Sequence, residues 1–204
     1  MSEGKLVPAR LARVAAGMLL HRLHHVDYPG ARFNPCLGPG TRFAPLEHAG
    51  SCIPTLYAAT TFDGAAFETV FRGRPHPFAG VPRQALATRG ASELRPLRDL
   101  PLVPFFSPEL GAWGLDPGAV FSPDASSYPG CRALALRAWA DNPSAVGLVW
   151  SSVRDSSAWA LLLFGDRLTE GDFDHARLRE VRSDPGLLAE LREAGRRGGF
   201  SITR

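Results

Sequence analysis

The chain has 204 residues and a mass of 22.0 kDa, which is enough for one domain with a hydrophobic core of its own. Its hydrophobic fraction of 45% and charged fraction of 21% are typical of a soluble globular protein and exclude a disordered or fibrous chain. The net charge is +3, and no stripe of basic residues alternates with aromatic ones, so we expect no direct binding to nucleic acid.

The cysteine count and the N-terminal hydropathy indicate a cytoplasmic protein. Cys36, Cys52 and Cys131 are odd in number and form no CxxC pair, so we expect free, small buried thiols rather than a disulfide framework. The apolar run from Val14 to Leu20 is too short to span a bilayer, and we expect no membrane association.

The first third of the chain predicts short elements separated by breakers. Residues 28–54 contain five prolines and several glycines and are expected to form loops. Thr60 or Thr61 can cap the helix that follows the apolar run 55–59. The predicted elements are a helix at 8–17, a strand at 18–23, a strand at 55–59 and a helix at 62–72.

The rest of the chain mixes strands and helices without regular alternation. Asp184 as a cap and Pro185 at the first helical position predict the last helix, which Gly198 ends. The predicted elements are strands near 92–97 and 100–106, helices at 108–115 and 126–140, a hairpin of 147–152 with 159–164 around a polar loop at 153–158, and a helix at 184–197. This order predicts an α+β fold, with residues 1–204 forming a single compact domain of mixed small sheets and flanking helices.

Three polar residues stand in apolar or glycine-rich segments: Arg42, Glu68 and Ser152. Burying an ionic group without a partner is costly, so such residues require either a structural ion pair or a polar cleft for an anionic ligand. Glu68 and Arg72 are spaced i, i+4, as in a structural pair on a helix surface. The small residues one turn before Glu68 instead predict room for a ligand beside the carboxylate. Both interpretations stay open.

Five short segments in this order resemble the RES domain family, which is named for its arginine, glutamate and serine. They are His21-Arg22-Leu23, Gly40-Thr41-Arg42-Phe43, Leu56-Tyr57-Ala58-Ala59, Ala65-Ala66-Phe67-Glu68-Thr69 and Gly147-Leu148-Val149-Trp150-Ser151-Ser152. The resemblance covers about residues 19–167, and segment 40–72 carries most of its specificity. Residues 73–130 are then expected to be a loop-rich insertion, and 184–197 an added C-terminal helix.

The resemblance implies an NAD⁺-degrading toxin of a bacterial toxin–antitoxin pair, with a fold similar to that of ADP-ribosyltransferases. Such an enzyme cleaves the nicotinamide–ribose bond with water or inorganic phosphate as acceptor, and it needs no metal and no cofactor beyond its substrate. The implied partner is an Xre-type helix-turn-helix antitoxin. A homodimer stays open.

Carried over by position, the resemblance assigns Glu68, Arg42 and Ser152 to catalysis. Arg22 and Tyr57 join Arg42 and Ser152 as substrate-binding residues. Arginine forks match phosphate oxygens, and an aromatic ring can stack on the cationic nicotinamide. A carboxylate stabilises the oxocarbenium character that develops when the bond to nicotinamide breaks.

Two assignments and two other functions stay open. Arg32 lies in a similar word, Gly30-Ala31-Arg32-Phe33-Asn34, although Arg42 is preferred because it directly precedes the Tyr57 strand. Ser151 stands next to Ser152 and competes for the same role. The alternatives to NAD⁺ cleavage are ADP-ribosyl transfer to a macromolecule and a non-catalytic module that binds a nucleotide or a partner protein.

Overall fold

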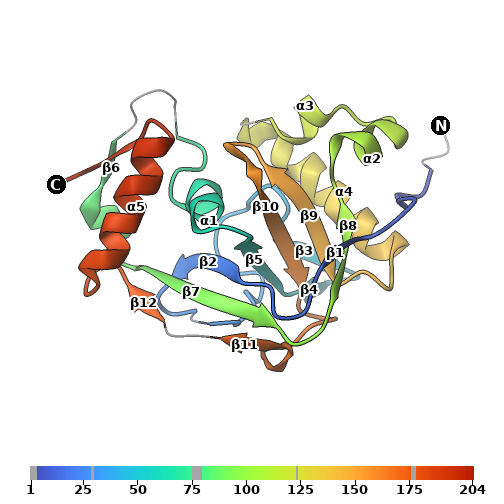
Figure 1. Ribbon diagram of the computed structural model, residues 1–204. Helices are drawn as coiled ribbons and strands as arrows, with labels where there is room; N and C mark the ends of the chain where they lie inside the picture. Colours follow the sequence, from blue (N-terminus) through green and yellow to red (C-terminus); the bar gives the residue numbers. More distant parts are fainter. Residues whose placement is uncertain (1–3, 29, 75–79, 123, 176–177) are drawn as a thin grey trace.

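A nine-stranded sheet runs through the protein (Figure 1). The computed structural model describes residues 4–28, 30–74, 80–122, 124–175 and 178–204. The strand order is β1-β8-β9-β10-β5-β2-β7-β11, and β12 also pairs with β7. All neighbours are antiparallel except β8 and β9. The strands are β1 Ala12–Val14, β2 Leu20–His25, β5 Thr55–Ala59, β7 Arg89–Pro96, β8 Leu100–Pro104, β9 Gly147–Ser152, β10 Asp155–Phe164, β11 Phe173–His175 and β12 Arg179–Glu180.

Two small two-stranded sheets and five helices complete the described structure. The sheets pair β3 with β4 and β6 with β13. Their strands are β3 Leu46–His48, β4 Ser51–Ile53, β6 Gly80–Pro82 and β13 Ser201–Thr203. The helices are α1 Phe62–Thr69, α2 Ser107–Ala112, α3 Pro117–Val120, α4 Tyr128–Asp141 and α5 Pro185–Arg197, with 3₁₀ turns η1 Arg83–Leu86, η2 Ala125–Ser127 and η3 Glu170–Asp172. None of the helices in the described part of the chain is long and apolar enough to cross a membrane.

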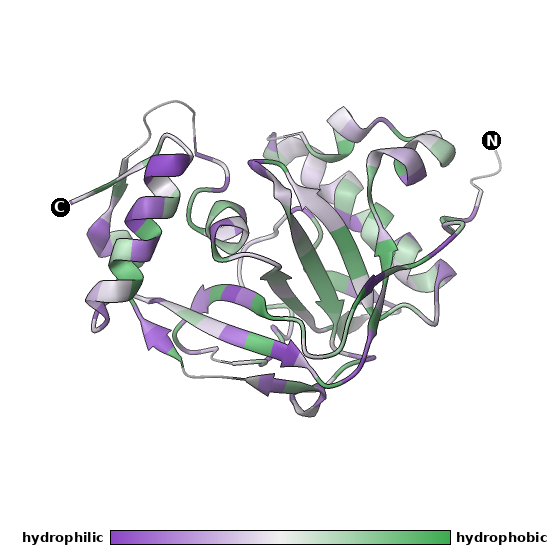
Figure 2. Cartoon of the chain, in the orientation of Figure 1, coloured by the Kyte–Doolittle hydropathy of each residue, from purple (hydrophilic) through white to green (hydrophobic). Residues whose placement is uncertain are grey.

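The core is built on both faces of β9 and β10. Alternating side chains of these strands point to opposite faces, so Leu162 belongs to the buried cluster that includes residues of α4, while Leu161 belongs to the cluster that includes residues of β2 and β7. A further cluster joins α1 and α5 through buried residues such as Phe71 and Leu191. Figure 2 shows the apolar character of β5, β9 and β10 at the centre and the alternation of polar and apolar residues along α5.

The α+β class is confirmed, and most predicted elements are present with bounds shifted by a few residues. The expected small sheets are instead one large sheet with two minor ones. β7 and β8 from the supposed insertion 73–130 belong to that large sheet, while residues 75–79 and 123 of this segment lie outside the described part. The C-terminal helix is capped by Asp184, whose side chain accepts from the Leu187 amide at 2.9 Å.

Three local predictions are wrong. The predicted helix at 8–17 is absent, because β1 pairs with β8 and buries Val14 completely. The loop 28–54 contains the β3–β4 hairpin. The loop of the larger hairpin is shorter than the predicted 153–158, because β10 begins at Asp155, whose carboxylate is held by Ser157 and by Arg197 of α5.

Candidate active site

Glu68 and Ser152 meet in the structure although they are 84 residues apart in the sequence. The Ser152 hydroxyl donates a hydrogen bond to Oε1 of Glu68 at 2.8 Å. Ser152 is the last residue of β9 and is buried, while Glu68 lies near the end of α1 and is partly exposed. The two residue types singled out by the sequence therefore form one polar unit.

Glycine in the first turn of α1 brings this helix close to the β9–β10 hairpin. A Cβ at Gly64 would lie 2.7 Å from the Cβ of Ala158 in β10, so a larger residue would push the helix away. The Thr61 hydroxyl accepts from the Gly64 amide at 3.0 Å and caps the helix, as predicted. Gly64 thus serves the close packing of α1 against β10.

A cavity of about 440 Å³ lies beside Glu68. Its wall includes Arg22 from β2, Tyr57 from β5, Arg72 after α1, and Arg89 from β7. Much of the remaining lining comes from the loop that joins β2 to β3. The lining of a single cavity therefore contains three arginines and one glutamate.

The positive charge of this cavity is not neutralised by ion pairs. Among the described residues, none of Arg22, Arg72 and Arg89 forms an ion pair. The Glu68–Arg72 pair is also absent, because α1 ends at Thr69 and Arg72 lies beyond its last turn. Burial lowers the pKa of Arg22 to about 10. Burial and then the charge of Arg72 lower the pKa of Arg89. The structural-pair interpretation of Glu68 is therefore wrong, and the cavity favours an anion.

Tyr57 is held by the loop that joins β2 to β3. Its hydroxyl lies 2.8 Å from the Thr41 hydroxyl and accepts from the Phe43 amide at 3.3 Å. Burial raises the pKa of Tyr57, so the side chain is a neutral phenol. Its ring meets Trp150 edge to face, with centroids 6.2 Å apart.

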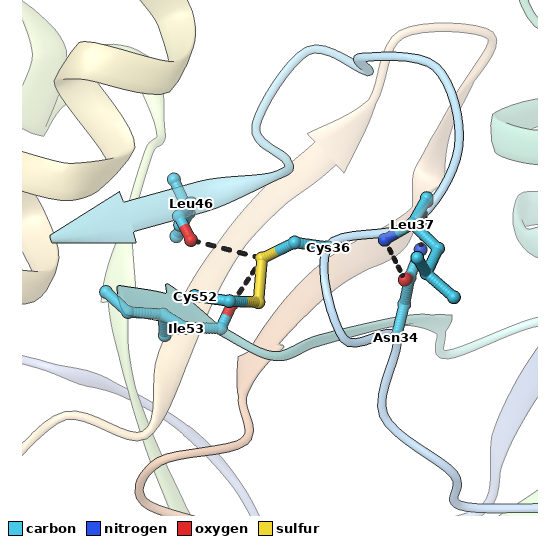
Figure 3. The surroundings of a disulfide bond; sticks show 6 residues. All are labelled: Asn34, Cys36, Leu37, Leu46, Cys52 and Ile53. Carbon is cyan, nitrogen blue, oxygen red and sulfur yellow. Dashed lines mark hydrogen bonds between the residues drawn. A yellow bond between two sulfur atoms is a disulfide. The ribbon is translucent and has the colours of Figure 1, made fainter. Parts of the chain in front are cut away.

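A disulfide joins Cys36 of this loop to Cys52 of β4 (Figure 3). We call residues 36–52 the strap. Cys36 and Thr41 of the strap both line the cavity. The expectation of free thiols is wrong for this pair, because the strap folds back through the β3–β4 hairpin and brings two distant cysteines together. Cys131 is free and buried.

Arg42 lies on the strap but outside the lining of the cavity. It is buried, and its guanidinium donates to the carbonyl oxygens of Phe121 and Ser122 at 3.4 and 3.2 Å. The rings of Phe121 and Tyr128 flank it at 5.6 and 5.9 Å. Arg42 therefore ties the strap to the segment between α3 and α4.

The two alternative residues take other positions. Arg32 is exposed and lies over the Tyr28 ring at 5.6 Å. Ser151 is exposed and pairs with Trp159 across the hairpin. Neither residue lines the cavity beside Glu68, whereas Ser152 bonds directly to that carboxylate.

A second hollow of about 560 Å³ opens beside Ser152. It is lined by Ser151 and Ser152 and by the aromatic residues Phe105, Phe106, Phe121 and Trp159, among others. The Ser152–Glu68 hydrogen bond therefore joins the wall of the aromatic hollow to the wall of the cationic cavity. This arrangement can hold an anionic group on one side of the carboxylate and an apolar ring on the other.

The sequence did not single out Arg72 and Arg89 as site residues. The spacing of Arg72 indicates only a partner of Glu68, and Arg89 enters the site through the pairing of β7 with β2, which no local pattern reveals. His24 also lines the cavity; its Nε2 lies 2.8 Å from the Ser92 hydroxyl, and burial lowers its pKa to about 4. The described residues include no group of three His, Cys, Asp or Glu side chains placed to hold a metal ion.

Comparison with known proteins identifies the family and the fold. A family model of the RES domain matches residues 19–182, most of the chain. No curated protein matches. Among solved structures, a chain of the M. tuberculosis MbcT–MbcA toxin–antitoxin complex aligns with a TM-score of 0.59 and 17% identity, covering 89% of this chain and 92% of that one. At this identity the likeness shows the fold alone.

Proposed function

This chain belongs to the RES domain family, and from its site we propose that it cleaves the bond between nicotinamide and ribose in NAD⁺. The observation that carries the proposal is the hydrogen bond from Ser152 to Glu68 beside a cavity lined by three arginines. NAD⁺ combines the groups that this site suits: a diphosphate, ribose hydroxyls and a cationic ring that leaves.

Glu68 stabilises positive charge in the proposed reaction. When the bond breaks, its electron pair leaves with nicotinamide, and the ribose carbon gains oxocarbenium character. An ionised carboxylate facing that carbon lowers the barrier most effectively when it is already oriented. The Ser152 hydrogen bond fixes Oε1, and among the described residues no other group bonds to the Glu68 carboxylate. Oε2 is then available to the substrate.

The acceptor of the ribosyl group is water or inorganic phosphate. Attack by water on the ribose carbon releases one proton and gives ADP-ribose, whereas attack by phosphate gives ADP-ribose carrying a new phosphate ester. The arginine-rich wall supports either an added phosphate or the diphosphate of the substrate. The product distinguishes the two reactions.

We propose that the biological role is that of a toxin in a bacterial toxin–antitoxin pair. The RES match and the fold shared with a toxin–antitoxin complex support this role. The partner proposed here is an Xre-type helix-turn-helix antitoxin, the place of action is the cytoplasm, where NAD⁺ is abundant, and the fold is related to that of ADP-ribosyltransferases.

The test is to identify the products formed from NAD⁺ by the purified chain. The protein is incubated with NAD⁺ in phosphate-free buffer and in phosphate, and nicotinamide and the ribosyl product are separated by chromatography. We expect nicotinamide release with ADP-ribose or its phosphorylated form as the co-product. Release of nicotinamide only when a protein acceptor is added, with ADP-ribose found on that protein, would instead establish a transferase.

A further inference from the structure

We infer that Arg72 and Arg89 form the binding site for the diphosphate of the substrate, and that they make the enzyme selective for ligands that carry one. This inference rests on the proposed function and adds two residues to it. Both side chains line the cavity that contains Glu68. Neither belongs to the set of residues that the family resemblance assigns.

The charges of the two arginines favour an anionic ligand. Arg72 and Arg89 are partly buried, and burial and then the like charge of Arg72 lower the pKa of Arg89. Among the described residues neither makes an ion pair or a hydrogen bond through its guanidinium group. Two like charges that form no ion pair repel each other, and a ligand with two adjacent phosphates relieves that cost.

The backbones that carry these arginines are fixed by packing. Arg72 follows Phe71, which is fully buried and stacks on Phe200 with ring centroids 5.0 Å apart. Arg89 is the first residue of β7 and is held on two sides. It is paired with His25 of β2, and its carbonyl oxygen accepts a hydrogen bond from the Val181 amide at 3.0 Å. A site whose supports are already ordered loses less entropy on binding than a mobile one.

The two arginines that the family resemblance assigns, Arg42 and Arg22, do not account for binding of the diphosphate. Arg42 is committed to the carbonyl oxygens of Phe121 and Ser122 and lies outside the cavity lining. Arg22 reaches the cavity but also donates to the Gly30 carbonyl. In the described lining of the cavity, Arg72 and Arg89 are the arginines whose guanidinium N–H groups make no hydrogen bond to the protein. All of these donors are therefore available to a ligand.

Binding of ADP and of adenosine tests this inference independently of the proposed reaction. The two ligands differ by the diphosphate, and neither contains a nicotinamide that could be released. Dissociation constants for both are measured by calorimetry with wild-type protein, Arg72→Gln, Arg89→Gln and the matched control Arg192→Gln, which changes an exposed arginine on α5. We expect each cavity variant to bind ADP at least about tenfold more weakly, since a hydrogen bond between charged groups contributes about that factor. Adenosine affinity and the control should not change.

Three outcomes are distinct. ADP affinity within twofold of wild type in both cavity variants, with thermal unfolding unchanged, overturns the inference even if NAD⁺ is cleaved. Equal weakening of ADP and adenosine also overturns it, because the loss is then not specific to phosphate. Selective loss of ADP binding in the cavity variants supports the inference. If the wild-type protein also releases no nicotinamide, only the proposed function fails.

Discussion

At the scale of single residues, the same chemical types perform different tasks in this protein. Arg42 is buried against carbonyl oxygens and holds the strap, whereas Arg22 faces the cavity. Ser151 is exposed and Ser152 is bonded to Glu68. These differences follow from which face of a strand or loop each side chain occupies, so the residue type alone does not fix the role.

Ser152→Ala is expected to reduce the rate of NAD⁺ cleavage by tenfold to a hundredfold, on the order of 1.5–3 kcal/mol in barrier height. The reason is that the variant removes the donor that orients the Glu68 carboxylate. Initial rates of nicotinamide release at saturating NAD⁺ measure the effect. Ser156→Ala is the matched control, an exposed serine on the paired strand β10, and should retain the wild-type rate. Equal losses in both variants would show that the Ser152–Glu68 bond has no special role.

His24 predicts a pH dependence of stability. Its pKa is lowered from 6.5 to about 4 by burial, so the unfolded chain binds a proton that the folded chain does not between these values. Stability is therefore lost as the pH falls through this window, by on the order of 3 kcal/mol at its lower end.

Chemical denaturation at several pH values between 7 and 4 checks the His24 prediction. His24→Gln removes the titrating group and should flatten the pH dependence of the free energy of unfolding, whatever its effect at pH 7. An unchanged slope in the variant would assign the acid sensitivity to other groups.

At the scale of elements, α1 and the strap place the site. Gly64 allows α1 to approach β10, and the strap supplies Thr41 to Tyr57 and several residues to the cavity wall. The disulfide closes the strap between its two ends. The precision of the site therefore depends on a segment with little regular structure.

Replacing both cysteines of the strap, Cys36→Ser with Cys52→Ser, is expected to lower the free energy of unfolding by about 3 kcal/mol. This is the loop-closure contribution for a sequence separation of 16 residues. Denaturation without reductant compares the variant with wild type. A dithiol reductant should bring wild type to the level of the variant and leave the variant unchanged. Wild-type protein that is insensitive to the reductant would show that the bond does not stabilise the fold.

Elements with strong local signals could be predicted from the sequence. The apolar run of β5 and the Asp184–Pro185 start of α5 both specify their element without help from distant residues. β1 and β12 could not be predicted, because strands of two or three residues form only where a partner strand already exists. The disulfide could not be predicted either, because the spacing of Cys36 and Cys52 in the sequence does not reveal that the two ends of the strap lie close together.

At the scale of the whole molecule, the sheet brings the site together from distant parts of the chain. Arg22, Tyr57, Arg89 and Ser152 come from β2, β5, β7 and β9, and only Glu68 comes from a helix. Four of these residues are ones that the family resemblance assigns to the site. The sequence could not predict Arg89, because the pairing of β7 with β2 is a long-range contact.

The most direct test of the account is nicotinamide release from NAD⁺ by wild-type protein and by Glu68→Gln, which keeps the shape of the side chain and removes its charge. ADP affinity, measured in parallel, reports whether the cavity is intact. We predict that wild type releases nicotinamide and that the variant is at least a hundredfold slower, about 2.7 kcal/mol in barrier height, with ADP affinity retained. A variant that cleaves NAD⁺ at the wild-type rate would contradict the central role of the Glu68 carboxylate.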